Sequence, residues 1–225
     1  MIRPTNTSHR LGSSAGILRR VSLLVVLSAC TNQSSGTAVA ANDMQTGDAR
    51  MAQILEGRAL VMNHDCAGCH GGGSNPAHPN WLSGARTKDD EFTIGPFKTR
   101  PRNLTPDNQT GIGRFTERQI FNALRYGLRP GETPDVEITS FTPGQGNFPL
   151  HPRYLAPPMP WTAWRYMSNK ELYAIAAYLK NGLKPVNHFV ADSEGPPDFW
   201  ASVYVADSIG TFPPAPFPTV RERAR

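Results

Sequence analysis

Apolar residues recur at helical spacing in three segments of this 225-residue chain. The first segment runs from Ala49 to about Asn63 and leads directly into Cys66. Its apolar positions lie three and four residues apart, which predicts a helix with one buried face. They are Met51, Ile54, Leu55, Leu60 and Val61.

Two further helices are predicted from signals at their first residues. Thr116 followed by Gln119, and Ser168 followed by Glu171, match the capping box, in which the two side chains satisfy each other's backbone N–H groups. The apolar stripes behind these caps are Ile120, Ala123 and Leu124 for one helix and Leu172, Ile175, Ala176 and Leu179 for the other, with Met167 placed to pack onto Leu172. The expected ends are Gly127 for the first of the two, and Gly182 with Pro185 for the second.

The stretches between these helices have weak periodicity of either kind. Residues 71–107 and 130–160 are rich in proline and glycine and are expected to be ordered loops. The tail, 190–225, contains Trp200 but many prolines, so we expect it to wrap the surface without forming a domain. The pattern as a whole predicts a mainly α fold with long loops.

The first helix leads into the motif Cys66-Ala67-Gly68-Cys69-His70. Two cysteines three residues apart lie on neighbouring positions of one helical face, where each thiol can bond one vinyl group of a haem. His70 follows directly and is placed to ligate the iron. Since the motif occurs once, we expect one covalently attached haem c per chain.

Three other interpretations use the same residues. A redox-active dithiol is expected beside a strand in a βαβ unit, which is not predicted here. A structural zinc site that used Cys66, Cys69 and a histidine would want a second pair of ligands, and the sequence has none. A disulfide between Cys66 and Cys69 would be strained and would leave His70 without a role.

Met159 is the candidate for the second axial ligand of the iron. It lies in Ala156-Pro157-Pro158-Met159-Pro160-Trp161, where prolines restrict the loop and lower the entropy lost when a thioether binds. His78, His151 and His188 are the alternatives. The other methionines considered, Met51, Met62 and Met167, are expected to pack in the core.

For the residues that would support the iron ligands, the sequence offers several candidates for each role. A ligating histidine donates its other ring nitrogen, and backbone carbonyls near Pro76 or Pro79 are the candidate acceptors for His70. The candidates for contact with a haem propionate are Arg100, Arg102 and Asn103.

The N-terminus has the pattern of an export signal. Arg19-Arg20 precede an apolar run over 21–27 that is too short to span a membrane permanently. Leu27-Ser28-Ala29-Cys30 resembles a bacterial lipobox, so Cys30 is the predicted lipid-attachment residue; cleavage after Ala40 is the alternative. The small, polar residues of 30–47 suit a flexible tether.

The charge of the chain depends on this leader. The net charge is +5, and removal of residues 1–29 takes away four arginines and no acidic residue, leaving about +1. The basic excess therefore belongs to the export signal, and a nucleic-acid partner is excluded.

With these motifs in place, the chain resembles the cytochrome c modules of bacterial membrane-bound alcohol and gluconate dehydrogenase cytochrome subunits, within the mono-haem class I family. The resemblance covers roughly 50–187. It is carried by Glu56-Gly57-Arg58, Cys66 to His70, Asn103 to Asp107, Thr110 to Gly113, Phe115 to Gly127, Pro157 to Trp161 and Met167 to Leu179. Those subunits carry three haems, whereas this chain has one such motif, and 132–154 looks like an added loop.

The resemblance implies a cytochrome c fold in which the first and third helices cross, with Gly57 opposite Tyr178, and long loops enclose the haem. The implied organisation is a lipoprotein signal peptide (1–29), a tether (30–47), a cytochrome c domain (48–189) and a proline-rich C-terminal extension (190–225). His70 and Met159 would be the axial ligands, and Cys66 and Cys69 the attachment points.

The expected function is that of a single-electron carrier, not an enzyme. It would sit on the periplasmic side of a bacterial membrane, lipid-anchored or alternatively soluble, and accept electrons from a dehydrogenase or another cytochrome. The alternative is a peroxidase-like or gas-binding haem protein with an open iron site, for which His151 would be the distal acid or base.

Overall fold

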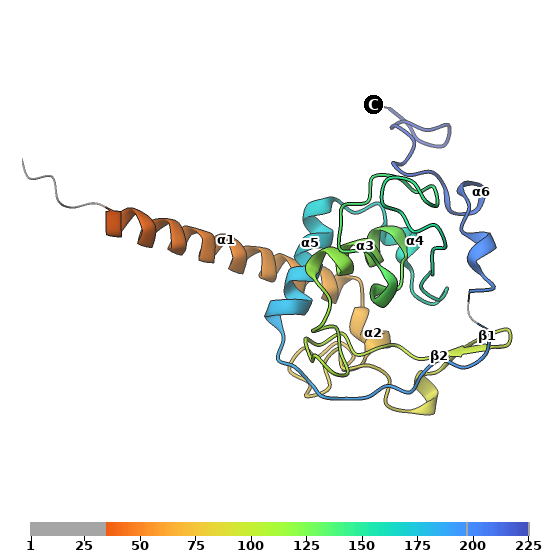
Figure 1. The fold of residues 1–225 in the computed structure, drawn as a ribbon, viewed down its shortest axis with the longest axis horizontal. Helices are drawn as coiled ribbons and strands as arrows, with labels where there is room; N and C mark the ends of the chain where they lie inside the picture. Colours follow the sequence, from red (N-terminus) through yellow and green to blue (C-terminus); the bar gives the residue numbers. More distant parts are fainter. Residues whose placement is uncertain (1–34, 197, 225) are drawn as a thin grey trace, which may run out of the picture. The chain divides into compact units, whose positions relative to one another are not determined.

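The computed structural model of the protein describes residues 35–196 and 198–224, and it is mainly helical (Figure 1). The described residues from Ala41 onward form one compact unit. The α-helices are α1 (Ser35–Asn63), α2 (Cys66–His70), α3 (Glu117–Tyr126), α4 (Trp161–Trp164), α5 (Asn169–Ala177) and α6 (Ala206–Ile209). Short 3-10 turns occur at η1 (Lys88–Asp90), η2 (Pro130–Glu132) and η4 (Ala201–Val203), and the π-helical turn η3 (Tyr178–Gly182) continues α5.

The first helix begins earlier than the sequence predicts. It starts at Ser35 instead of Ala49, so residues 35–47 of the expected tether are helical. The small, polar composition of this stretch gives no apolar stripe, and periodicity therefore could not reveal its helical state. The predicted signal peptide, 1–29, and Cys30 lie outside the described residues.

Only one side of α1 packs into the protein. Gly57 lies so close to α5 that a Cβ there would overlap the carbonyl oxygen of Ala174 and approach the Cβ of Tyr178 to 2.9 Å. Val61, one helical turn later, is fully buried. Met51 and Met62 face away from this side and are 55% and 38% exposed, so the prediction that they pack in the core is wrong.

Both predicted capping boxes are confirmed. In α3 the Thr116 hydroxyl accepts from the Gln119 N–H (3.1 Å), and the Gln119 side chain accepts from the Thr116 N–H (3.0 Å). Ser168 and Glu171 make the same pair of bonds at the start of α5, at 3.2 and 2.8 Å. Each box satisfies two backbone donors that the helix leaves unpaired.

Helices α3 and α5 pack against each other through the stacked rings of Phe121 and Tyr173, whose centroids are 4.4 Å apart. Gly127 ends α3 as predicted, with φ of 70°, a left-handed conformation that suits glycine. A Cβ at Gly127 would overlap the indole ring of Trp161, which is 1% exposed. The end of α3 therefore provides the notch that holds the start of α4.

The two predicted loop regions contain more backbone pairing than the sequence suggests. Strands β1 (Phe92–Ile94) and β2 (Phe97–Thr99) form an antiparallel hairpin within 71–107. Three-residue strands are too short to give an alternating pattern, which explains why periodicity missed them. The ends of the second loop also pair, because Leu128 bridges to Tyr154 and the Leu155 N–H donates to Gly127 (2.6 Å).

The C-terminal tail contributes to the core as well as wrapping the surface. Trp200 is 3% exposed, and its ring meets Phe97 edge-on at 4.8 Å. The Tyr204 ring lies 5.0 Å from Trp161. Trp200 and Tyr204 thus attach the tail to the hairpin and to the start of α4.

Candidate functional site

The Cys-x-x-Cys-His motif forms the short helix α2, as its spacing predicts. Its first turn begins after Asp65, which takes a left-handed conformation and turns the chain sharply out of α1. Cys66 is half-buried and Cys69 is exposed. Burial raises the pKa of the Cys66 thiol to about 12, so this thiol is protonated at neutral pH.

The imidazole of His70 is held by one backbone hydrogen bond. Its Nδ1 lies 2.6 Å from the carbonyl oxygen of Arg102, so Nδ1 carries the proton and donates it. Nε2 is then the deprotonated nitrogen and has a lone pair available for a metal. Burial lowers the pKa of His70, which favours the same neutral form, although the Arg102 carbonyl opposes this shift.

The acceptor of this bond is not the one that the sequence suggests. The sequence favours backbone carbonyls near Pro76 or Pro79 as the acceptor. In the structure the acceptor is the backbone carbonyl of Arg102. Backbone bonds explain the difference, because they place 101–104 beside the chain that follows α2. The Gly84 N–H donates to the backbone carbonyl of His70 (2.7 Å). The Ala85 N–H donates to the carbonyl of Pro101 (2.9 Å), and the Leu104 N–H donates to the carbonyl of Leu82 (2.8 Å).

The side chain of Arg102 joins this acceptor segment to the C-terminal tail. Its guanidinium donates to the carbonyls of Val190 (2.9 Å) and Ala191 (3.3 Å) and to the carboxylate of Asp192 (3.1 Å). The carbonyl that orients His70 is therefore fixed from the far end of the chain. Sequence reasoning missed this positioning role, because the partners are about 90 residues apart and carry no shared motif.

The three residues predicted to contact a propionate are all engaged with the chain itself. Arg100 forms ion pairs with Glu91 and Glu194. Asn103 is 1% exposed, donates to the Val186 carbonyl (2.8 Å), and accepts from Thr105. All three side chains tie the 100–103 segment to other parts of the chain, most of them in 186–194. Their contact with a haem propionate stays a prediction.

Met159 lies in a loop whose shape is set by its neighbours. Its N–H donates to Ala156 and its carbonyl accepts from Trp161, both at 2.9 Å. Trp161 in turn is anchored in the notch at Gly127. Met159 is half-buried and packs against the same apolar core that Cys66 borders. The structure thus brings the predicted thioether ligand and the α2 motif to one core.

The three histidines considered as alternative iron ligands do not pack against this core as Met159 does. His188 Nε2 lies 2.9 Å from the Ala85 carbonyl, and His78 Nδ1 accepts from the Asn80 N–H at 3.1 Å. His151 is exposed in the long loop before α4. Their rings are engaged with backbone or point to solvent, whereas Met159 faces the core.

The donor set fits a covalently bound haem. It consists of two thiols on one turn of helix, a neutral imidazole with Nε2 unprotonated, and a thioether held beside the same core. This chemistry is that of c-type haem attachment and axial ligation.

Comparison with known proteins decides the family. The sequence profile of cytochrome c matches residues 54–182, which is more than half of the chain. The chain belongs to the cytochrome c family. This cytochrome therefore carries covalently bound haem c, and its role is electron transfer, as the sequence predicts.

Characterised relatives are cytochrome subunits of dehydrogenases. The cytochrome c subunit of the quinone alcohol dehydrogenase of Gluconacetobacter polyoxogenes is 30% identical over 154 residues, which are 68% of this chain and 26% of the relative. The fructose dehydrogenase cytochrome subunit of Gluconobacter japonicus is 25% identical over 62% of this chain and 23% of its own length. The gluconate 2-dehydrogenase cytochrome c subunit of Pantoea cypripedii is 26% identical over 73% of this chain and 32% of its own length. The matches span about a quarter to a third of these relatives.

Proposed function

We propose that Cys66 and Cys69 would attach the haem and that His70 and Met159 would both ligate its iron. The observation that carries this assignment is the hydrogen bond from His70 Nδ1 to the Arg102 carbonyl, which leaves Nε2 unprotonated on the helix that bears both thiols. Bound haem supplies a one-electron couple between ferric and ferrous iron. With His70 and Met159 both bound to the iron, no site would remain on the metal for a substrate.

The chain's own residues prepare this site for electron transfer. The Arg102 carbonyl keeps the His70 ring in one orientation and one tautomer, which limits the change in structure between the two oxidation states. The proline-flanked loop holds Met159 against the core. A crossing of α1 and α5 with the haem enclosed by the long loops is the arrangement that we infer, supported by the close approach of Gly57 to Ala174.

We further propose that the electron donor is a dehydrogenase of the kind named among the relatives. In native membranes that contain the cytochrome, ethanol, fructose or gluconate should produce the reduced haem spectrum within minutes. Membranes without added substrate are the control. The haem-loaded protein should also titrate reversibly with one electron and reject carbon monoxide when reduced. Carbon monoxide binding would contradict the closed iron site, and failure of all three substrates would contradict the proposed donors.

We also propose that Cys30 carries a lipid that holds the cytochrome on the periplasmic side of a membrane. The support is the lipobox-like Leu27-Ser28-Ala29-Cys30. Among the helices of residues 35–196 and 198–224, none is long and apolar enough to cross a membrane.

Lipidation is tested by fractionation and mass. The mature protein should start at Cys30 with the added mass of the acyl chains and remain with the membranes. The Cys30→Ala variant should appear in the soluble periplasmic fraction, since a lost lipid removes about 0.8 kcal/mol of membrane affinity per buried CH₂. A wild-type protein cleaved after Ala40 and recovered without lipid would contradict the proposal.

A further inference from the structure

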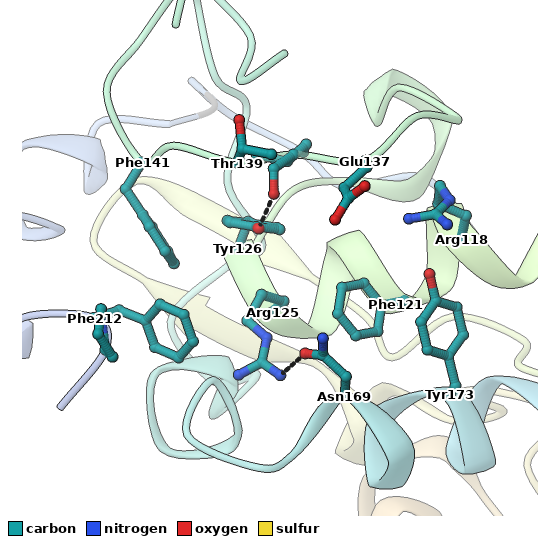
Figure 2. A pocket seen from close by; sticks show the side chains of 12 residues that line it. Arg118, Phe121, Arg125, Tyr126, Glu137, Thr139, Phe141, Asn169, Tyr173 and Phe212 are labelled. Carbon is teal, nitrogen blue, oxygen red and sulfur yellow. Dashed lines mark hydrogen bonds between the residues drawn. The ribbon is translucent and has the colours of Figure 1, made fainter. Parts of the chain in front are cut away.

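A cavity of about 410 Å³ lies between α3, the start of α5, residues 137–141 and the C-terminal tail (Figure 2). Phe212 from the tail and Phe141 from the loop form one side, and Phe121 and Tyr173 form the other. None of Cys66, Cys69, His70 and Met159 lines it. The cavity is therefore separate from the proposed haem ligands.

The cavity wall contains a buried cation that lacks an acidic partner. Arg125 is 3% exposed, and its guanidinium donates to the Arg165 carbonyl and to Asn169 Oδ1 (2.8 Å). These two bonds leave three of its five N–H groups available. Among the described residues, no carboxylate lies within 4 Å of it.

A second buried cation lies behind the same aromatic wall. Arg165 is 3% exposed, and its guanidinium carbon lies 4.8 and 5.6 Å from the ring centroids of Phe141 and Phe212. Within the described chain, its Nε and Nη1 have no hydrogen-bond partner and no carboxylate forms an ion pair with it. The stacked rings compensate the charge only in part, since a cation–π contact is weaker than an ion pair in the same low-polarity setting.

The buried charged side chains of this region, Arg125 and Arg165, are therefore both cations. Arg118 adds a third guanidinium at the cavity, whereas Glu137, the acidic residue that lines it, is exposed and lies more than 4 Å from all three arginines. Burial lowers the pKa of both Arg125 and Arg165, which reflects the cost of keeping two cations out of water. An anion in the cavity would offset that cost.

The remaining walls indicate what kind of anion fits. Phe121, Tyr126, Phe141 and Phe212 present ring faces and edges, which favour a flat, apolar body. The Tyr173 hydroxyl is buried and has no hydrogen-bond partner among the described residues, so it is available to donate. We propose that this cavity binds a small organic anion with a planar apolar body and one carboxylate, held by Arg125, Arg118 and Tyr173.

The test is calorimetric titration of the haem-loaded protein with 2-naphthoate, with the uncharged 2-naphthylmethanol as the matched ligand. The carboxylate should bind about tenfold more tightly than the alcohol, because it gains hydrogen bonds to charged groups. Arg118→Gln and Phe212→Ala should each weaken 2-naphthoate binding about tenfold. Arg125 is not substituted in this test, because its guanidinium also ties α3 to residues 165 and 169. Arg58→Gln, an exposed residue of α1, controls for the lost charge and should change nothing.

Three results would overturn the proposal. One is the absence of binding at millimolar 2-naphthoate, and another is equal binding of the acid and the alcohol. The third is a change in the haem spectrum that follows the titration, which would place the carboxylate on the iron instead of in the cavity.

Discussion

Replacement of Met159 by alanine is expected to open the iron site and to lower the reduction potential by on the order of 0.1 V, within the roughly 0.8 V over which axial ligands set haem potentials. The physical reason is that a thioether stabilises the ferrous state, and alanine offers no ligand. Optical spectra should lose the ferric methionine-to-iron charge-transfer band, and the reduced variant should bind carbon monoxide.

Met167→Leu is the matched control. Met167 is half-buried against the same core, and an exchange of similar volume costs less than about 1.5 kcal/mol. Its spectrum and potential should stay those of the parent protein. A Met159→Ala variant that kept the band and rejected carbon monoxide would show that another residue, such as one of the histidines, ligates the iron.

The largest effect on stability is expected from Gly57→Ala. A single added Cβ would overlap the Ala174 carbonyl oxygen and lie 2.9 Å from the Tyr178 Cβ, so α1 must move away from α5. We expect the free energy of unfolding to fall by about 3 kcal/mol or more, at the upper end of overpacking. Urea denaturation of the haem-loaded protein, followed by circular dichroism, measures this change.

The same substitution elsewhere on α1 should have the opposite sign. A Cβ on Gly47 would meet nothing within 4 Å, so Gly47→Ala should raise the free energy of unfolding by up to about 1 kcal/mol through helix propensity alone. Equal effects at the two positions would mean that the contact between Gly57 and α5 does not stabilise the fold.

Features encoded within a few residues could be predicted from the sequence. The capping boxes at Thr116 and Ser168, the stop at Gly127 and the helical turn at Cys66–His70 all depend on neighbours one turn away. These local signals are enough to place α3, α5 and the haem-binding motif.

Features that depend on distant partners could not be predicted. The acceptor of His70 is Arg102, 32 residues away, and Arg102 is itself held by Asp192. Met51 and Met62 fit the helical pattern but face outward, because α1 packs only along the side of Gly57 and Val61. Periodicity describes a face but not whether a neighbour covers it.

The link between Arg102 and the tail also has a consequence for the order of assembly. Synthesis proceeds from the N-terminus, so the Cys66–His70 motif leaves the ribosome long before residues 190–192 exist. Until those residues are made, the Arg102 carbonyl that accepts from His70 lacks its anchor. Contact of residues 190–192 with Arg102 supplies that anchor, so the orientation of the His70 ring depends on a segment about 90 residues further along the chain.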